Sequence, residues 1–526
     1  MRFSAQQSPR RDEEQADDIG VAERTLDDVA EPARTDPHMS GVTSAQVRAG
    51  LDHPIIDADG HFVEMAPILH DELVATLEEL GGAALRDRYL AGDVRPTDTS
   101  AVLADRTLAG ASDSWSAMPS WWGWPCENSR DRATAHLPGL LHERLDELGI
   151  DFAVLYPSMS LAFLEIDDDE LAAGLCRAVN RHHARVFAPY ADRMTVGALI
   201  PMNSPASAVA ELRYAVEELG LKAGVMAAYA RRPIAKLQRE HGRLSPAVYR
   251  LDHFGLDSEH DYDPYWQACV ELRFAPAVHA SVQYHDLSRS TSSYVFNHMN
   301  GISKCHEALA KSLFLGGVTH RFPELRLGFL EGGVAWASML YTSLLGHWEK
   351  RNARDIMRLD PDRLNVDEVM AFVDSHGDDA TRAHADRLRA WFSAPASRPA
   401  QLDEFAAAML ERPEDIREKF VTNFFMGCEA DDPLVAWAFD GRVSPLGARL
   451  HAMFGSDISH WDVPDMAEPV AEAYELVEHG HITPADFREF TFTNAVRMHA
   501  GANPDFFRGT VVEAAVAAEL AALGEP

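Results

Sequence analysis

Short apolar runs alternate with longer helical patterns from about residue 50 onward, and this alternation restricts the fold more than any other feature of the sequence. It is typical of parallel strands joined by crossover helices. In the clearest unit, the apolar run 195–201 is followed by Ser204 and Pro205. These two residues favour the start of a helix, which we expect to end at Gly220.

Eight such runs are predicted to be strands, and their order along the chain is 54–61, 152–157, 195–201, 223–228, 274–280, 326–331, 424–429 and 451–457. Eight parallel strands with helices between them form a (β/α)8 barrel, so the predicted fold class is an α/β TIM barrel. Polar residues gather at the carboxyl ends of the runs, where such barrels place their active sites. Long insertions after the first, fourth and sixth strands are candidate lids.

The chain of 526 residues can be divided into a tail, one barrel and two helical additions. Residues 1–50 are rich in charge and lack sustained periodicity, so we expect a disordered acidic tail, with a helical oligomer contact as the alternative. The barrel is predicted over residues 51–500. An inserted helical subdomain is expected at about 351–420, and a C-terminal helical extension at 501–526.

The net charge and the cysteine pattern indicate which binding partners and which cellular compartment to expect for this chain. The formal net charge of -34 disfavours nucleic acid and anionic lipid, because both would be repelled by an acidic surface. No apolar run is long enough to span a membrane, and the N-terminus lacks a secretory signal. The five cysteines are widely spaced and form no CxxC motif, which favours reduced thiols and a cytoplasmic location. A small-molecule substrate and a homo-oligomeric assembly are the expected partners.

Candidate metal ligands lie at three of the predicted strand ends. Asp59 and His61 are two apart in IIDADGH and therefore point to the same side of the first strand, which must be the barrel lumen. His279 ends the fifth run, and Asp457 ends the eighth. The alternative is that Asp59 caps a turn beside Gly60 while His61 makes a local hydrogen bond. Their common position on one rim favours a divalent ion, which can be Zn, Mn or Fe.

The sequence resembles the amidohydrolase superfamily, and within it the aminocarboxymuconate-semialdehyde-decarboxylase-like branch called the amidohydrolase-related family. The resemblance covers most of residues 52–500, outside the long insertions. It rests on IIDADGH, YPS, CRAVN, AVHA, RFPELRLGFLEGG, FGSDISHWD and TNAVR. It implies a single metal ion whose ligands are Asp59, His61, His279 and Asp457.

Two departures from the family pattern bear on the chemistry. The family usually opens with an HxH pair, and some of its aromatic decarboxylases carry ExH, whereas this chain has Asp59 before His61. The added carboxylate hardens the ligand set and favours manganese or iron over zinc. Glu331 occupies the position after the sixth strand where many members place a histidine, so it is either a general acid or base or an ion-pairing neighbour of the metal. A second ion would require a lysine at the end of the fourth strand, where it could form a bridging carbamate. Lys222 lies before that strand, so one ion is expected rather than two.

Four further residues are predicted to contact substrate. Trp122 lies in a tryptophan-rich insertion that either stacks on a planar substrate or packs the loop onto the barrel. Arg289 can pair with a substrate carboxylate, although it can equally be an exposed residue, and His298 lies in the same stretch. Tyr156 follows the second strand and is expected at the rim.

The resemblance implies two chemistries that use the same metal. In one, the metal activates water and Asp457 carries the proton to a leaving group. In the other, the metal binds a carboxylate while Asp457 or Glu331 delivers a proton to carbon. The carboxylate-x-His opening favours a nonoxidative decarboxylase or other C–C bond-cleaving enzyme acting on a small, aromatic carboxylate. A hydrolase of a small amide, lactone or diketone is the alternative, and a non-catalytic barrel that serves as an interaction partner is the third interpretation.

Overall fold

The computed structural model describes residues 41–91, 118, 128–242, 248–279, 290–395, 398–460 and 462–524. The chain divides into two units, Met1–Gly41 and Val42–Pro526. Because nearly all of the first unit lies outside the described residues, the fold below is that of the second.

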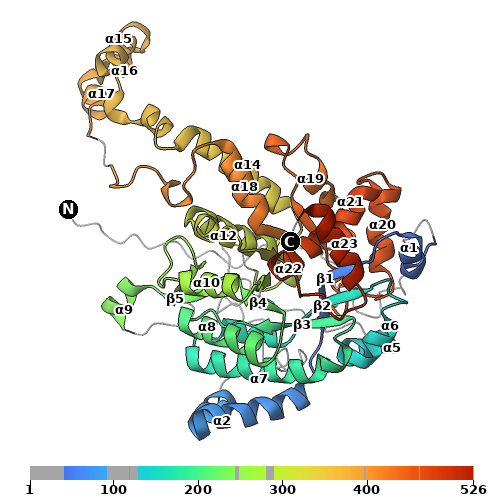
Figure 1. Ribbon diagram of the computed structural model, residues 1–526. Coiled ribbons are helices and arrows are strands. Elements are labelled where there is room, and N and C mark those ends of the chain that lie inside the picture. Colours follow the sequence, from blue (N-terminus) through green and yellow to red (C-terminus); the bar gives the residue numbers. More distant parts are fainter. Residues whose placement is uncertain are drawn as a thin grey trace, which may run out of the picture. The chain divides into compact units, whose positions relative to one another are not determined.

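Eight parallel strands form one sheet, and each pairs with the next strand in its order. Helices lie between successive strands, so the predicted (β/α)8 barrel is confirmed (Figure 1). Every predicted run contains its strand or overlaps it. The strands in sheet order are β1 (Ile56–Phe62), β2 (Phe152–Pro157), β3 (Met194–Leu199), β4 (Ala223–Ala227), β7 (Ala277–His279), β8 (Leu327–Phe329), β9 (Phe424–Cys428) and β10 (His451–Phe454).

The first and last strands meet at their carboxyl ends. The Asp457 N–H donates to the Asp59 carbonyl at 3.0 Å, and the His61 N–H donates to the Ile458 carbonyl at 3.1 Å. The buried Asp57 carboxylate joins the same two segments, because it accepts hydrogen bonds from the Ser456 N–H at 3.0 Å and the Ser456 hydroxyl at 2.6 Å. The candidate ligands on β1 and after β10 are thereby held together by backbone bonds.

Apolar strands and amphipathic helices explain this arrangement. All residues of β1, β2, β4 and β9 are buried, as expected for strands covered on both faces. In Figure 1, α7 lies between β3 and α2, and both contacts bury apolar side chains. The helices around the barrel include α2 (Ala66–Ala91), α5 (Ser129–His136), α6 (Pro138–Arg144), α7 (Asp169–Phe187), α8 (Pro205–Arg213), α10 (Asp263–Glu271), α12 (Gly301–Leu315), α13 (Val318–Arg321), α14 (Ala335–Arg351), α18 (Pro413–Asn423), α20 (Pro469–Glu478), α21 (Pro484–Arg488) and α22 (Asn494–Ala502).

The unit around 195–220 forms as its residues predict. β3 is followed by α8, which starts at Pro205 after Ser204, and the Ser204 hydroxyl accepts a hydrogen bond from the Ser207 N–H at 3.2 Å. The helix then continues as a π-helical turn before Gly220, whose φ of 69° lies in the left-handed region that glycine tolerates. An N-cap residue, a first-turn proline and a terminal glycine were therefore sufficient to predict where this helical segment begins and ends.

The insertion after β4 contains a hairpin that the strand prediction did not include. Strands β5 (Ala230–Pro233) and β6 (Tyr249–Asp252) pair antiparallel. The buried Arg232 guanidinium donates to the Asp252 carboxylate at 3.1 Å and to the Tyr262 hydroxyl at 2.7 Å. The hairpin is short and rich in charge, so it lacked the apolar pattern of the barrel strands.

The disordered tail predicted for residues 1–50 includes residues that are helical in the structure. Residues Ser44–Gly50 form helix α1, which begins with a capping box between Thr43 and Gln46. Val47 is buried, and the Ser44 hydroxyl donates to the Ala467 carbonyl. This short helix docks on α20, so its order comes from a distant contact that residues 1–50 do not reveal by themselves. Residues 1–40 lie outside the described residues.

Helices also occupy the predicted insertion and the chain end. The insertion contains α15 (Val366–His376), α16 (Asp379–Ala383) and α17 (Ala385–Phe392), and α15 contacts both of the others. Helix α23 (Glu513–Leu523) follows α22 near the C-terminus and packs against it. The remaining short helices are α9 (Ala235–His241), α11 (Tyr294–His298) and α19 (Ala436–Phe439).

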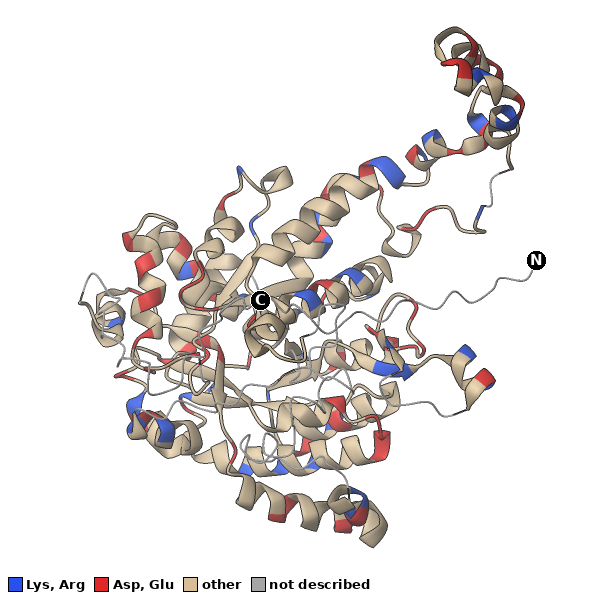
Figure 2. Cartoon of the chain, turned by 180° about the vertical axis from the view of Figure 1, so that it is seen from behind, with Lys and Arg blue, Asp and Glu red and all other residues tan. Residues whose placement is uncertain are grey.

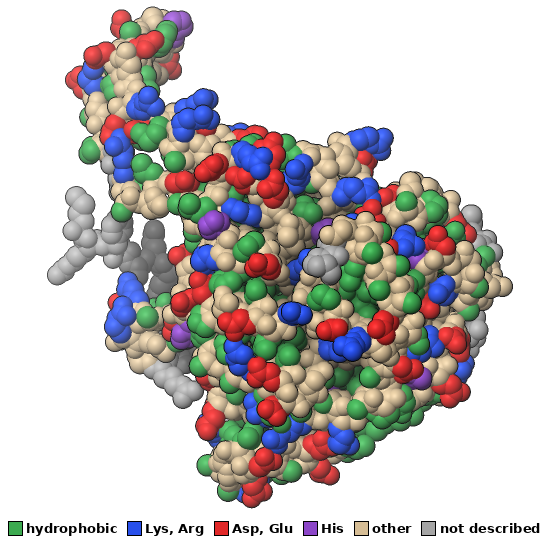
Figure 3. Space-filling model, viewed as in Figure 1, with side chains coloured by type: hydrophobic (Ala, Val, Ile, Leu, Met, Phe, Trp, Pro, Cys, Tyr) green, Lys and Arg blue, Asp and Glu red, His purple; other side chains and the backbone are tan. Residues whose placement is uncertain are grey.

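Charged residues lie mainly on the helices and loops, while the strands carry few of them (Figure 2). On the face drawn in Figure 3, acidic and basic side chains are interspersed. None of the helices in the described ranges combines the length and the apolar character needed to cross a lipid bilayer.

Candidate metal centre

Carboxylates and imidazoles from four strands meet at the carboxyl end of the barrel. Asp59 and His61 lie on β1, His279 ends β7, Glu331 follows β8, and Asp457 follows β10. Each of these side chains is at most 6% exposed. Because a buried polar group is costly unless it is paired, such a cluster requires a physical explanation.

The four residues predicted as ligands converge on one ring nitrogen. His61 Nε2 lies 3.2 Å from His279 Nε2, 3.5 Å from Asp59 Oδ1 and 3.4 Å from Asp457 Oδ1. Ligands bound to one ion at 2.0–2.2 Å in a tetrahedral arrangement lie about 3.4 Å from each other. Asp59, His61 and His279 offer donor atoms that all lie within 4.8 Å of one another, so these three can share a single divalent ion, whereas Asp457 shares such a group with His61 but not with Asp59 and His279.

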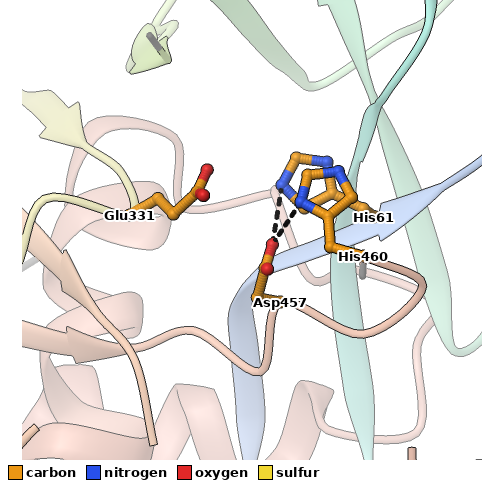
Figure 4. A group of neighbouring side chains, drawn as sticks. All are labelled: His61, Glu331, Asp457 and His460. Carbon is orange, nitrogen blue, oxygen red and sulfur yellow. Dashed lines mark ion pairs between the residues drawn. The ribbon is translucent and has the colours of Figure 1, made fainter. Parts of the chain in front are cut away.

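His460 is a member of this centre that the sequence did not identify. Its ring stacks on that of His61, with centroids 3.7 Å apart, and its Nδ1 lies 2.8 Å from Asp457 Oδ1 (Figure 4). Its Nε2 lies 3.0 Å from the Ser158 hydroxyl. One donor atom each from His61, Glu331, Asp457 and His460 lie within 4.8 Å of one another, so this group too can hold an ion. The available signal was its place three residues after Asp457, in the same SDISH segment.

Glu331 faces the centre from the opposite side to Asp457 (Figure 4). Its Oε2 lies 2.9 Å from His279 Nε2. Burial alone would raise the pKa of this carboxyl, but the charge and the hydrogen bond of His279 outweigh burial and lower the pKa to about 2. The residue is thus an ionised carboxylate beside an imidazole, which favours the ion-pairing role considered for it from sequence over that of a proton donor.

Several buried atoms of the centre lack hydrogen bonds. Within the described residues, Asp59 Oδ1, both carboxylate oxygens of Asp457 and His61 Nδ1 make no hydrogen bond of good geometry. Burial raises the pKa values of Asp59 and Asp457 well above their ordinary range, and it lowers the pKa of His61 well below its own. A divalent cation offsets this desolvation by supplying the missing charge partner. The residues present therefore fit a metal ion.

The backbone that positions the two opposing carboxylates is strained. Glu331 has a φ of 57° and Asp457 a φ of 48°, both in the left-handed region that non-glycine residues rarely adopt. Such conformations cost about 1–3 kcal/mol each and occur often at functional sites. The segment after β10 can approach Asp59 closely only because residue 455 is glycine. A Cβ on Gly455 would lie 2.9 Å from the Asp59 Cβ.

The residues predicted to contact substrate fall into two groups. His298, at the end of α11, has a ring nitrogen within 4.8 Å of ligand atoms of Glu331 and Asp462, so it lies at the mouth of the centre. Tyr156 is 1% exposed, with its ring centroid 6.4 Å from that of His61, so it packs below the centre rather than at the rim. Arg289 and Trp122 lie outside the described residues.

A further carboxyl group, Glu429, follows β9 at the mouth, near Glu331 and Asp462. Burial, and then the charges of Glu331 and Asp462, raise its pKa to about 9. Glu429 ends the predicted run 424–429, so its position was available from sequence, but it was not proposed as a site residue. A carboxyl with this pKa is uncharged near pH 7, and a cation bound nearby would favour its ionised form.

Comparison with known proteins gives a family and a fold. A family model described as Amidohydrolase matches residues 56–414, which is more than half of the chain. No curated protein matches. A solved amidohydrolase from Mycobacterium avium subsp. paratuberculosis K-10 is 14% identical, with 85% of this chain and 98% of that chain covered and a TM-score of 0.50.

Two solved decarboxylases are also similar to this chain. One is 2,6-dihydroxybenzoate decarboxylase from Rhizobium, which is 16% identical with a TM-score of 0.41, covering 85% of this chain and 98% of that chain. The other is a dihydroxybenzoic acid decarboxylase from Polaromonas sp. JS666, solved with bound manganese and the inhibitor 2-nitroresorcinol. It is 15% identical with a TM-score of 0.45, covering 85% of this chain and 97% of that chain.

Proposed function

Because the chain belongs to the amidohydrolase family, we propose that it is a metal-dependent carboxy-lyase acting on a small aromatic carboxylate, by decarboxylation or a related C–C bond cleavage. The observation that carries the proposal is a buried cation site flanked by two His–carboxylate pairs. These pairs are His279 with Glu331, and His460 with Asp457.

We propose that one ion is bound by His61 together with the three residues whose donor atoms lie around its Nε2. Carboxylate oxygens are hard ligands and imidazole nitrogens are borderline, so the set suits manganese or iron as well as zinc. His460 contacts both Asp457 and the His61 ring, so it orients two of the ligands from outside the set. The proposed ligands are Asp59, His61, His279 and Asp457.

The bound ion would neutralise a substrate carboxylate and an adjacent oxygen, and so stabilise the charge that develops on carbon as the C–C bond weakens. The chain's own residues must then exclude water and supply a proton. The ligand side chains are almost fully buried, which limits water at the reacting carbon. Exclusion of water favours loss of carbon dioxide over hydrolysis, because hydrolysis requires a water molecule held against the substrate.

Loss of carbon dioxide leaves an electron pair on carbon that must accept one proton. We assign this proton to Asp457, whose buried carboxyl contacts His460, a group that can return a proton after each turnover. Glu331 is ionised, so we assign it the role of holding His279 in place rather than that of the proton donor. His298, at the mouth, and the predicted residues Arg289 and Trp122 are proposed to orient the substrate, while Tyr156, packed below the centre, is proposed to support His61.

A screen for released carbon dioxide tests the reaction class. Purified enzyme loaded with manganese, iron or zinc is incubated with hydroxybenzoates and other unsaturated carboxylates, and carbon dioxide is measured together with the decarboxylated product. Product formation with stoichiometric carbon dioxide supports the proposal. Turnover of amides, lactones or diketones without carbon dioxide would instead establish the hydrolase alternative.

The ligand set is tested with His279→Ala. We expect loss of bound metal after dialysis and loss of turnover, with unchanged circular dichroism, because His279 Nε2 lies 3.2 Å from His61 Nε2 at the centre. The matched control is His320→Ala, which removes an exposed imidazole on α13. Metal content and activity equal to the control would remove His279 from the ligand set.

We also propose a cellular compartment and an oligomeric state for the enzyme. The described cysteines Cys176, Cys269, Cys305 and Cys428 are buried and form no disulfide, which supports a reducing, cytoplasmic environment. A homo-oligomer with a small-molecule substrate, rather than nucleic acid, as its partner is the assembly we propose. Exposed apolar side chains such as Phe372 on α15 and Trp391 on α17 supply surface for self-association. Light scattering on purified protein measures the assembly.

A further inference from the structure

Helix α11, which carries His298 at the mouth of the metal centre, has an inverted pattern of burial. Its one buried residue is Asn297, whose amide side chain is polar and which is 3% exposed. The apolar residues Val295 and Phe296 are 56% and 53% exposed. A surface helix normally buries its apolar face and leaves its amide side chains in water. Hydrophobic packing therefore does not explain where α11 lies.

The length of α11 and its neighbour in sequence also give it little support. The helix has five residues, and helices this short are marginal without tertiary contacts. Asn300 follows with a φ of 58°, in the left-handed region, so the chain turns before α12 begins at Gly301. The position of α11 must therefore be set by other contacts.

The side chain of Asn297 supplies such contacts. Its Oδ1 accepts a hydrogen bond from the Ser290 N–H at 2.7 Å, and its Nδ2 donates to the Ser290 carbonyl at 2.8 Å. The same Nδ2 donates to the Met118 carbonyl at 3.1 Å. The Met118 N–H completes the network, because it donates to the Ser290 carbonyl at 2.9 Å. Both N–H groups and the oxygen of the buried amide are thereby used.

This network of Met118, Ser290 and Asn297, which we call the Asn297 clasp, joins three separate segments. Met118 belongs to the insertion after β1 and lies 179 residues from Asn297 in the chain. Ser290 belongs to the segment between β7 and α11. One N–H requires an acceptor and two carbonyls require donors, so an amide fits in one orientation only. A carboxylate has the same shape but no donor, and a hydroxyl has only one.

The clasp determines where the next residue lies. Neighbouring side chains on a helix point about 100° apart, so Asn297 can face the clasp while His298 faces another direction. A ring nitrogen of His298 lies within 4.8 Å of ligand atoms of Glu331 and Asp462. The His298 ring also stacks on that of Tyr294, with centroids 5.4 Å apart, so the imidazole is packed against its own helix. A shift of α11 would therefore move His298 away from the centre.

We propose that Asn297 is a positioning residue, which fixes His298 at the mouth of the metal centre through the Asn297 clasp. The proposal rests on the proposed function, since His298 is assigned there to the substrate. Asn297 acts through His298 and not through the metal ligands. The clasp thus sets the affinity for a substrate carboxylate and leaves the affinity for the metal ion unchanged.

Hydrogen exchange followed by mass spectrometry tests the clasp in the full-length, manganese-loaded protein. Asn297→Asp keeps the shape and the acceptor oxygen but removes both N–H donors. We expect peptides that contain Met118 and α11 to exchange at least about 10-fold faster, since two carbonyls lose a donor, while α14 is unaffected. The control Asn365→Asp makes the same change at the exposed N-cap of α15 and should alter neither peptide. Unchanged exchange of both peptides in Asn297→Asp would overturn the proposal.

A double-mutant cycle tests whether Asn297 acts through His298. Calorimetry measures the affinity of the manganese-loaded protein for 2-hydroxybenzoate in the unmodified protein, Asn297→Asp, His298→Gln and the double variant. We expect Asn297→Asp to weaken binding by about 10-fold, in the range typical of residues coupled in one hydrogen-bond network, with manganese affinity unchanged. In the His298→Gln background it should add nothing. Additive losses would show that Asn297 does not act through His298, and would overturn the proposal.

Failure of this proposal can be told apart from failure of the proposed function. If the unmodified protein does not bind 2-hydroxybenzoate, the substrate class is wrong, and exchange of the Met118 and α11 peptides decides the role of Asn297.

Met118→Pro covers the case in which Asn297→Asp does not fold. Proline removes the N–H that Met118 donates to Ser290 and leaves the Asn297 side chain intact. Faster exchange of the α11 peptide in this variant supports the proposal, and exchange equal to that of the unmodified protein contradicts it.

Discussion

The two ends of the same three strands carry different ionisable side chains, carboxyl groups at one end and guanidinium groups at the other. At the carboxyl ends of β8, β9 and β10 stand Glu331, Glu429 and Asp457, whereas Arg326 and Arg449 stand before β8 and β10. In a barrel of parallel strands, all residues that follow a strand lie at one mouth, and all residues that precede a strand lie at the other. One set of strands thus keeps its acidic and its basic flanking residues at separate ends of the barrel.

The two ends also differ in how their polar groups are satisfied. At the metal centre, buried carboxylate oxygens lack hydrogen bonds and Glu331 and Asp457 have strained backbones. At the amino end, most of the charge is paired, since Arg449 and Arg497 both contact Glu489. The carboxyl end therefore has buried polar groups that a bound ion would satisfy, whereas the amino end is held by ion pairs within the chain.

The largest expected effect comes from His61→Ala. His61 Nε2 lies within 3.5 Å of a donor atom from each of the other three proposed ligands. We expect metal affinity to fall by more than about 100-fold, beyond the loss typical of an outer residue, together with turnover. Metal content after dialysis is measured beside that of the unmodified protein. Equal metal content in the two proteins would remove His61 from the ligand set.

A smaller loss is expected for His460→Asn, which tests the outer support of the metal centre. The residue is a positioning group, because it contacts Asp457 and stacks on His61. Metal affinity should fall by about 10- to 100-fold. Ser158→Ala, which removes only the hydroxyl next to His460 Nε2, is the control and should have a lesser effect. Isothermal titration with manganese measures both, and equal affinity in all three proteins would exclude this role.

Asp57→Ala tests whether the link between β1 and the segment after β10 is structural. The substitution leaves the buried Ser456 N–H and hydroxyl without their acceptor, so unfolding free energy should fall by about 2 kcal/mol. Asp57→Asn keeps an acceptor oxygen and is the matched control. Urea unfolding of the metal-free proteins measures the difference. Equal stability of the two variants would show that this carboxylate does not close the barrel.

The smallest effect is expected at the helical cover near the amino end. His499 on α22 is buried and stacks on Phe506, and burial lowers its pKa from 6.5 to about 3. The folded state therefore holds a neutral ring, and the stability this gives above pH 6.5 is lost progressively as pH falls toward 3. Between pH 7.5 and pH 6, we expect a loss of about 1 kcal/mol in the unmodified protein from this group.

His499→Phe should remove that loss, because phenylalanine cannot be protonated. Urea unfolding at the two pH values measures it. His481→Gln, which removes an exposed imidazole, serves as the control and should retain the pH dependence of the unmodified protein. An unchanged slope in His499→Phe would mean that the ring is charged or solvated in the folded state.

The sequence predicted those features that depend on short stretches of chain. The run 152–157 forms β2 at the predicted residues, and the other seven runs differ from their strands only at the ends. Asp59 and His61 point to the same side because side chains alternate along a strand, and their atoms lie 3.5 Å apart. The tail boundary was wrong because α1 is ordered by a contact with α20, a distance of more than 400 residues along the chain.

The sequence by itself therefore determined the barrel, the rim of candidate ligands and the family, since apolar periodicity and strand-end residues are local patterns. Only the tertiary structure decided that His460 stacks on His61, that Glu331 pairs with His279, and that arginines from three separate segments line one cavity. The physical reason is that these contacts join residues far apart in the chain. Their proximity arises when the sheet closes and left-handed turns at Glu331 and Asp457 redirect the side chains, and neither event leaves a periodic signal in the sequence.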